Sequence, residues 1–278
     1  MKKISRRSFM AAAAVSVAAL ALTACGGSAS SAASSVASSA ASSEAASSAA
    51  AAELTTVEAG KLTMATNAAF PPYEMTTDAG EFEGIDVDTA KAIAEKLGLE
   101  LQIDDMDFDA ALLSVQQGKA DIVMAGVTVT DERKAVMDFS DSYATGIQSI
   151  IVPNDSKIAS PDDLAGKTIG TQRGTTGYIY CSDDFGDENV VAYDDGLTAV
   201  QALNNGQVDA VVIDNAPAQE FVAANPGLKV LDTSYAEEDY AIGMAKGSAL
   251  EDAVNKALEE LKADGTLQAI VDKYINAN

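Results

Sequence analysis

The sequence predicts an α/β protein in which parallel β-sheets are flanked by helices. From residue 61 onward, short apolar runs alternate with amphipathic segments, which is the pattern of strands joined by helices. A helix–glycine–strand unit at 111–123 also recurs at 199–211. The chain has 278 residues, of which 47% are hydrophobic, so it can form one large or two ordinary domains.

In the first half of the folded part, the apolar run 61–66 predicts a strand. Residues 86–97 predict a helix, because their apolar side chains are spaced for one face and Gly98 follows as a stop signal. The alternation then continues with a strand at 99–104, a helix at 109–117 and a strand at 121–125.

The second half repeats this alternation. Short apolar runs predict strands at 167–171, 190–193 and 209–213. Amphipathic segments predict helices at 176–184, 197–205 and 215–224. At the carboxyl end, 249–276 predicts two helices that are broken at Asp264 and Gly265.

The two repeated units place small polar residues after their strands. Gly126, Thr128 and Thr130 follow the first strand, and Asp214 and Asn215 follow the second. Ligands of open α/β sheets bind outside the carboxyl ends of the strands. Two similar lobes that face each other with these ends would form a cleft between them. The alternative is an ordinary reuse of the helix–glycine–strand unit without paired lobes.

The chain is strongly acidic and lacks histidine. Its 42 acidic and 18 basic residues give a net charge of −24, which excludes a nucleic-acid partner because the surface would repel phosphates. Without histidine, Ser–His and Cys–His catalysis and the commonest zinc ligand are excluded. Two cysteines are too few for a disulfide scaffold or a thiolate metal cage. We therefore expect no metal and no cofactor, and the acidic surface is explained most simply by solubility.

Residues 1–24 predict a signal peptide. Basic residues precede an apolar run at 10–22, which is too short to span a bilayer. The run ends in LTAC at 22–25, which resembles a bacterial lipobox, so Cys25 is the predicted lipidation site. The segment SRRSFM at 5–10 resembles a twin-arginine signal, but it also fits an ordinary charged region, so the export route stays open.

Residues 25–52 predict a solvated tether, because they are mostly serine and alanine and show no apolar periodicity. With a lipid on Cys25, such a tether would hold the folded part away from a membrane. We expect an extracytoplasmic protein that is lipid-anchored to the outer face of the cell membrane.

Only two arginines, Arg133 and Arg173, follow the predicted signal peptide. A guanidinium can bind a carboxylate through two parallel hydrogen bonds, which a lysine cannot. Thr130 is the predicted cap of a helix whose third residue is Arg133, close to the end of the 121–125 strand. Arg173 lies in the turn GTQRGTTG at 170–177, whose backbone N–H groups could hold an anion. The alternative for either arginine is a solvated ion pair at the surface.

One acid and two aromatic residues are further candidates for the cleft. Asp214 follows the apolar run 210–213, so its carboxylate is either the N-cap of the next helix or the partner of a cation. Phe70 and Phe108 lie beside turns, where an aromatic ring is either part of the core or a platform for a ligand.

These segments together resemble the polar amino-acid-binding proteins of bacterial ABC importers, which form family 3 of the solute-binding proteins. The resemblance covers residues 55–278 and rests on many motifs in the same order, none of which is specific alone. The first motifs are ATNAAFPPYE at 65–74, GIDVD at 84–88, MDF at 106–108, AGVTVTDER at 125–133 and DFS at 138–140. Those that follow are DLAGK at 163–167, GTT at 174–176 and VDAVVID at 208–214.

The resemblance implies a binding site for a free amino acid. Arg133 would hold the α-carboxylate, together with the N–H of Thr128 and with Thr176. Asp214 and the carbonyl of Gly126 would hold the α-ammonium, and two aromatic rings would enclose the side chain. A zwitterion that leaves water needs such a partner for each of its charges. The predicted ligand-binding residues are Asn67, Phe70, Phe108, Gly126, Thr128, Arg133, Gln172, Thr175, Thr176 and Asp214.

Two departures from the family pattern bear on the ligand. Asn67 stands where relatives that select cationic side chains often have an acid, and Gln172 stands where some glutamine-binding relatives have a lysine. Glu74 and Asp107 could still supply negative charge at the edge of the site. We therefore expect a polar L-amino acid with a cationic or an amide side chain.

The resemblance also implies a two-lobe, periplasmic-binding-protein-like fold of type II, with parallel-type sheets flanked by helices and two hinge strands. The crossings are expected near 142–151 and 234–243. Lobe 1 would then comprise 53–145 and 239–278, and lobe 2 would comprise 146–238.

The implied function is that of the substrate-binding component of an ABC transporter. The lobes would close about the amino acid by a hinge movement, and a membrane permease would recognise the closed form. We expect a monomer without catalytic residues. The alternatives are an extracellular amino-acid sensor, or a dehydratase-like enzyme on the same fold, which would need an acid–base pair that the sequence does not offer.

Overall fold

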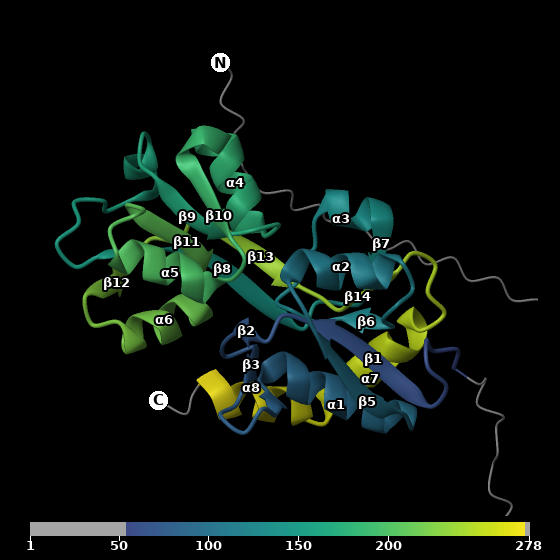
Figure 1. Ribbon diagram of the computed structural model, residues 1–278. Helices are drawn as coiled ribbons and strands as arrows, with labels where there is room; N and C mark the ends of the chain where they lie inside the picture. The colour runs from purple at the N-terminus through teal and green to yellow at the C-terminus, as the bar shows by residue number, and fades with distance from the viewer. Residues whose placement is uncertain (1–53, 276–278) are drawn as a thin grey trace, which may run out of the picture. The chain divides into compact units, whose positions relative to one another are not determined.

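A computed structural model describes residues 54–275 of the chain (Figure 1). The signal peptide, Cys25 and the tether, all predicted at 1–52, lie outside the described residues. The described residues form two mixed sheets, each packed against helices, and a small third sheet.

The first sheet has five strands, in the order β5 (Glu100–Asp105), β1 (Lys61–Thr66), β6 (Ile122–Val123), β14 (Gly243–Ala245) and β7 (Met137–Phe139). β1 is parallel to β5 and β6, whereas β14 is antiparallel to β6 and β7. The prediction of a parallel sheet is therefore wrong for β14 and its neighbours. β14 enters this sheet from the second one, in the direction opposite to β6.

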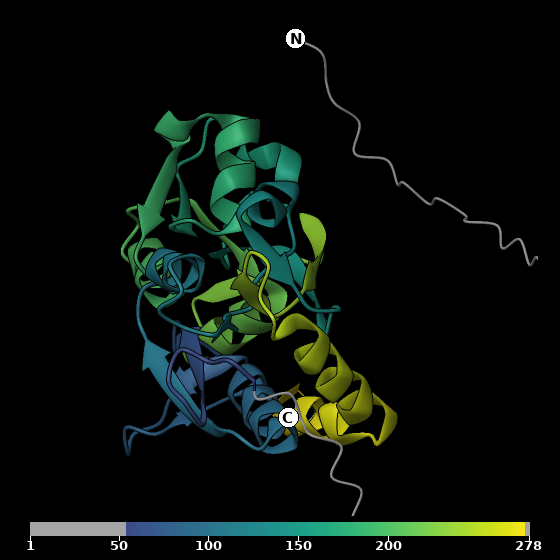
Figure 2. The same ribbon diagram turned by 90° about the vertical axis from the view of Figure 1, so that its right-hand side faces the viewer.

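Side chains that alternate along β1 build two cores, one on each face of the first sheet. Leu62 and Met64 pack in one cluster with residues of α1 (Ile85–Leu97), α7 (Glu251–Ala263) and α8 (Thr266–Ile275). Ala65 packs in another cluster with α2 (Phe108–Gln116). Figures 1 and 2 show α7 and α8, in yellow, beside α1 and on the side of the sheet away from α2.

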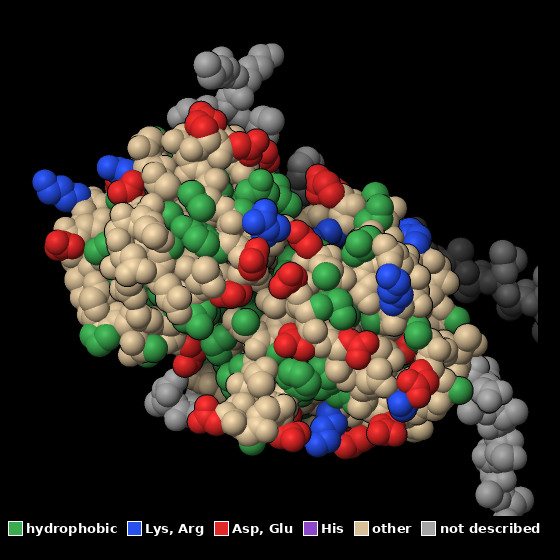
Figure 3. All heavy atoms as spheres, in the orientation of Figure 1, with side chains coloured by type: hydrophobic (Ala, Val, Ile, Leu, Met, Phe, Trp, Pro, Cys, Tyr) green, Lys and Arg blue, Asp and Glu red, His purple; other side chains and the backbone are tan. Residues whose placement is uncertain are grey.

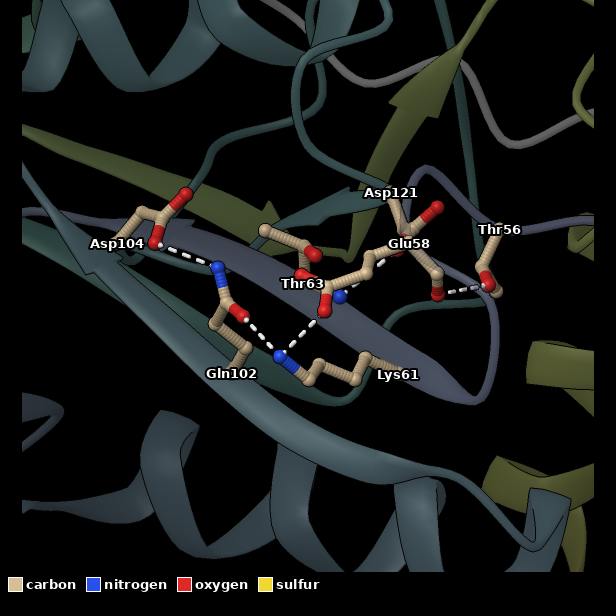
Figure 4. A network of polar contacts seen from close by, with 7 residues as sticks. All are labelled: Thr56, Glu58, Lys61, Thr63, Gln102, Asp104 and Asp121. Atoms are coloured by element: carbon tan, nitrogen blue, oxygen red, sulfur yellow. Dashed lines mark hydrogen bonds and ion pairs between the residues drawn. The ribbon is translucent and has the colours of Figure 1, made fainter.

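Polar contacts hold the first half of β1 against its neighbours (Figure 4). The carboxylate of Asp121 accepts the N–H of Thr63 at 2.8 Å, and Lys61 donates to Gln102 of β5 at 3.2 Å. These bonds fix the register of β1, whose carboxyl end leads into the loop that carries Asn67.

The second sheet has the order β10 (Val190–Tyr193), β9 (Ile169–Gln172), β11 (Ala210–Asp214), β8 (Ala144–Pro153) and β12 (Leu228–Val230), and β13 (Ala236–Tyr240) also pairs with β8. β9 is parallel to β10 and β11, and β8 is antiparallel to its three partners. Val211 and Ile213 pack with α5 (Gly196–Asn204) and α6 (Asn215–Ala224). Val212, which faces the other way, packs with Cys181 of α4 (Thr176–Phe185).

β8 and β13 connect the two sheets. β8 follows β7 of the first sheet, β13 leads to β14 of the same sheet, and the two strands pair antiparallel from Ala144 opposite Tyr240 to Gln148 opposite Ala236. The two crossing strands are thus present where they are predicted. The first sheet with its helices is called the first lobe, and the second sheet with its helices the second lobe. The residue boundaries of the lobes stay a prediction.

The repeated helix–glycine–strand unit is confirmed as two similar turns. α2 leads through Gly118 to β6, and α5 leads through Gly206 to β11, with φ angles of 66° and 67° at the two glycines. In both turns the glycine N–H bonds back to the residue three positions earlier, and the following N–H to the residue five positions earlier. Glycine adopts this left-handed conformation without steric cost, which explains its place at both helix ends.

Short elements around proline and turn residues are not predicted from the sequence. The third sheet consists of β2 (Ala69–Phe70), β3 (Glu74–Thr76) and β4 (Phe82–Glu83), which pair antiparallel. Two single-turn 3₁₀ helices lie at Pro161–Leu164 and Asp187–Asn189. Segments of two to four residues are too short to show a periodicity.

Candidate functional site

A cavity lies where strands of both lobes end. Asn67 follows β1 and Gly126 follows β6, whereas Gln172 and Asp214 are the last residues of β9 and β11. The space between its walls is about 320 Å³, part of it open to solvent. All ten predicted ligand-binding residues line it. The full lining is Asn67, Phe70, Glu74, Phe108, Ala125, Gly126, Thr128, Arg133, Gln172, Thr175, Thr176 and Asp214.

Arg133 reaches from the first lobe across this cavity. It lies in α3 (Asp131–Val136), whose cap is Thr130 as predicted: the Thr130 hydroxyl accepts the N–H of Arg133 at 3.1 Å. The guanidinium donates to the carbonyl oxygen of Thr128 at 2.8 Å and to that of Gly174, in the second lobe, at 3.2 Å. It also stands 5.3 Å from the centre of the Phe108 ring, within range of a cation–π contact. Burial lowers the pKa of Arg133, but an arginine remains charged at any physiological pH.

Asp214 provides the opposite charge from the second lobe. It is the N-cap residue of α6, but its carboxylate makes no capping hydrogen bond, so the prediction that this carboxylate caps the helix is wrong. Its carboxylate instead accepts hydrogen bonds from Gln148 Nε2, at 2.7 Å, and from the hydroxyl of Tyr240. Burial raises the pKa of Asp214 to about 7, and the charge of Glu238 acts in the same direction. A cation beside this carboxylate would favour its ionised form.

Glu74 adds a second acid to the cavity wall. It is fully buried on β3, and neither carboxyl oxygen has a hydrogen-bond partner of ordinary geometry in the described part of the chain. Burial raises its pKa well above the usual value, and the charge of Asp86 raises it further. Asp86 accepts the N–H of Gly126 at 3.0 Å and the hydroxyl of Tyr143 at 2.7 Å. Burial therefore favours the neutral form of Glu74, and an approaching positive charge would favour the ionised form.

The remaining predicted residues complete the walls from both lobes. Gln172 donates to the side-chain oxygen of Asn67 at 2.9 Å, which joins the two lobes directly. Phe70 stacks on Tyr73 with ring centres 5.9 Å apart. Thr175 caps α4 by accepting the N–H of Tyr178, and Thr176 is the first residue of that helix.

Arg173 and Asp107 do not line this cavity. They border a neighbouring groove together with Asp109 and Asp194. The side chain of Arg173 is 56% exposed, and its Nε lies 3.7 Å from the carboxylate of Asp194, so the surface ion pair is the correct interpretation. Cys181 is buried, and burial raises the pKa of its thiol to about 12.

The family model of the bacterial extracellular solute-binding proteins, family 3, matches residues 62–277. The chain belongs to this family of solute-binding proteins. The L-cystine-binding protein TcyJ of Escherichia coli K12 is 33% identical to it over 225 residues, which are 80% of this chain and 85% of the relative.

Solved structures of similar proteins share the two-lobe fold of type II. The arginine-, lysine-, histidine-binding protein ArtJ from Geobacillus stearothermophilus has a TM-score of 0.75 at 35% identity, covering 78% of this chain and 96% of that chain. An ancestral arginine-binding protein bound to glutamine has a TM-score of 0.74 at 42% identity, covering 78% of this chain and 98% of that chain. The fold predicted for this family-3 solute-binding protein is thereby confirmed, with mixed rather than parallel sheets.

Residues 54–275 of this family-3 solute-binding protein contain neither a helix suited to cross a membrane nor a cluster of metal ligands. None of the helices there has both the length and the apolar character that a bilayer crossing requires. No cluster of three or more potential metal ligands occurs among the same residues.

Acidic side chains outnumber basic ones on the face seen in Figure 3.

The polar residues behind the cavity are not predicted from the sequence. Gln148, Glu238 and Tyr240 bond to the residues that line it, but no motif marks them. Gln148 does carry a signal, because with Ser149 it interrupts the apolar run 147–152. Glu238 carries none, since it stands within the acidic run 237–239 and only the pairing of β13 with β8 buries it.

Proposed function

We propose that this family-3 solute-binding protein captures a polar L-amino acid between its lobes and delivers it to the permease of an ABC transporter. The observation that carries the proposal is that Arg133, from the first lobe, and Asp214, from the second, line one cavity. An α-carboxylate and an α-ammonium need partners of opposite charge when they leave water. Relatives named as binding arginine, lysine, histidine or cystine support this proposal.

The same placement of charges supports hinge closure. A single amino acid can contact both Arg133 and Asp214 only while the lobes are together, so it binds the closed form more tightly than an open one. This difference in affinity is what a ligand needs to shift a conformational population. The permease would then distinguish the loaded form by the approach of the two lobes.

Isothermal titration calorimetry with arginine, glutamine, histidine and cystine tests the site. We expect Arg133→Lys and Asp214→Asn each to weaken binding by about a hundredfold or more, because each leaves a buried charge of the ligand without its partner. Arg173→Lys is the matched control, since Arg173 lies outside the cavity. Unchanged affinity in both cavity variants, with a cooperative thermal transition, would refute the site.

We propose further that the ligand side chain is cationic rather than an amide. Arg133 is the single basic residue of the described cavity lining, whereas Glu74 and Asp214 are acidic and Asp86 lies directly behind. A cationic side chain would favour the ionised form of Glu74 and form a charge-assisted bond with it. An amide side chain would not oppose the effect of burial on that carboxyl.

The variant Glu74→Gln separates these two ligand classes. We expect it to weaken arginine binding by about tenfold or more, the effect of losing one hydrogen bond between charged groups, and to change glutamine binding much less. Calorimetry in buffers of different ionisation enthalpy should also show more protons released with arginine than with glutamine, and no such difference in the variant. Equal losses for both ligands would contradict the cationic assignment.

We propose finally that Cys25 carries a lipid, on the strength of the lipobox-like LTAC at 22–25. Cys25→Ser should move the protein from the membrane fraction to the soluble fraction of the cells. Cys181→Ser, at the buried cysteine, is the control and should not change the distribution.

A further inference from the structure

Glu238 occupies an unusual place on the crossing strand β13. Its neighbours Glu237 and Asp239 are exposed, whereas the side chain of Glu238 is only 7% exposed. One carboxylate oxygen, Oε2, accepts three hydrogen bonds: from Thr128 Oγ1 at 3.1 Å, Gln148 Nε2 at 3.0 Å and Thr176 Oγ1 at 2.9 Å. The other oxygen is buried and has no hydrogen-bond partner among the described residues.

The three donors come from different parts of the fold. Thr128 follows β6 in the first lobe, Thr176 begins α4 in the second lobe, and Gln148 lies on β8, the other crossing strand. A single oxygen on β13 is therefore bound by both lobes and by the other crossing strand, β8. The hydroxyl oxygens of Thr128 and Thr176 are held 3.5 Å apart as a result.

Separation of the lobes would break this arrangement. Because Thr128 and Thr176 belong to opposite lobes, both can bond to Glu238 only while the lobes are in contact. Hydrogen bonds to a buried carboxylate are charge-assisted and are stronger in an environment without water. Glu238 also places negative charge near Arg133, where it opposes the effect of burial on the guanidinium.

We propose that Glu238 is a positioning residue that stabilises the closed arrangement of the lobes and thereby slows release of the ligand. It does not line the cavity itself and acts through Thr128 and Thr176, which do. The proposal rests on the proposed function in so far as it concerns ligand release. The effect on the lobes themselves does not depend on any ligand.

The test compares Glu238→Gln with Glu237→Gln, which removes the same charge from the exposed face of the same strand. L-arginine is the probe, with glutamine as a second ligand if arginine does not bind. We expect Glu238→Gln to raise both the dissociation rate and Kd about tenfold, with little change in the association rate, because a neutral amide oxygen accepts the three hydrogen bonds more weakly than a carboxylate oxygen does. Glu237→Gln should match the unaltered protein.

Small-angle X-ray scattering gives a readout that needs no ligand. Without added amino acid, Glu238→Gln should have a larger radius of gyration than Glu237→Gln, and saturating arginine should reduce the difference. If no amino acid binds the unaltered protein, the proposed function fails, but a larger radius in Glu238→Gln still supports the role of Glu238.

Three results would overturn the inference. One is a Glu238→Gln protein with a lower melting temperature but unaltered Kd, dissociation rate and radius, which would mean a merely structural role. The second is tighter binding, which would mean that Glu238 competes with the ligand for the two hydroxyl protons. If Glu238→Gln does not fold, Glu238→Asp is tested instead, because it keeps the charge but has a shorter side chain. An unchanged dissociation rate in Glu238→Asp is the third result that would overturn the inference.

Discussion

The carboxylate of Asp214 titrates near neutral pH because it is buried at the end of β11. Its pKa is raised to about 7, although the hydroxyl of Tyr240 and the amide of Gln148 oppose the shift. A ligand ammonium beside it would stabilise the ionised form. Ligand binding and loss of the Asp214 proton are therefore linked.

We predict from this linkage that amino-acid affinity falls as the pH falls below about 7, by at most about tenfold per pH unit. Protonated Asp214 is neutral and cannot pair with the α-ammonium. Calorimetry at pH 5, 6, 7 and 8 measures the effect. Tyr240→Phe removes a hydrogen bond to the carboxylate, so it should move the decline to higher pH. A Kd that stays constant from pH 5 to 8 would contradict the role of Asp214.

The turn between β9 and α4 shows how one element closes the site from the second lobe. The carbonyl of Gly174 accepts a hydrogen bond from Arg133 at 3.2 Å. Gly174 has a φ of +72°, and a Cβ added there would lie 1.6 Å from a carboxylate oxygen of Asp109 on α2. A side chain at residue 174 would therefore displace the carboxylate of Asp109 from the turn.

We predict that Gly174→Ala weakens ligand binding by up to about tenfold, since the Asp109 carboxylate is displaced and the carbonyl of residue 174 would shift relative to Arg133. Gly166→Ala is a closely matched control, because Gly166 also has a φ of +72° but has no atom within 4 Å of the added Cβ. Both variants should lose about 1 kcal/mol of unfolding free energy from the left-handed backbone. Calorimetry and thermal unfolding separate the two effects, and equal affinities would disprove the contact.

At the level of elements, most of the fold follows from local pattern. The helix predicted at 215–224 is α6 with the same bounds, because its amphipathic spacing begins directly after an apolar strand. The strand predicted at 121–125 is shorter in the structure, Ile122–Val123, and the carboxylate of Asp121 just before it accepts the N–H of Thr63. β3, which carries Glu74, is three residues long and follows two prolines, so no periodicity could show it.

For the whole molecule, the sequence predicts which residues line the cavity. It does not predict which buried residues behind the cavity bond to them. The motifs give the order of residues such as Arg133 and Asp214, and the strand ends bring them to one cavity. The bonds of Glu238 depend on the register of β13 against β8, where Glu238 stands opposite Gly146. The register of such long-range pairing cannot be predicted from the pattern of a short sequence segment.

Buried acids also govern how the stability of the whole molecule depends on pH. Asp86 and Asp214 have pKa values raised by burial to about 6 and about 7, well above the ordinary value of 3.8. Between about pH 4 and pH 7 the folded state therefore binds more protons than the unfolded state. The stability that these two groups contribute is present below pH 4 and is lost as the pH rises through 6 and 7. Partly exposed acids such as Asp138, whose pKa the ion pair with Lys246 lowers, act in the opposite sense only below about pH 4.

We predict that the melting temperature without ligand falls between pH 5 and pH 8, the reverse of what ordinary exposed carboxylates produce. Repulsion among the surface acids in Figure 3 acts in the same direction, but 0.5 M salt screens it, whereas buried groups are screened much less.

Arginine at 100 times its Kd should add about 2.7 kcal/mol of unfolding free energy. At a fixed arginine concentration the rise in melting temperature should be larger at pH 8 than at pH 5, because the ligand ammonium favours ionised Asp214. Thermal unfolding in 0.5 M salt measures how the melting temperature changes with pH, both without ligand and with arginine. A melting temperature without ligand that increases with pH would show that the buried acids do not control the pH dependence of stability.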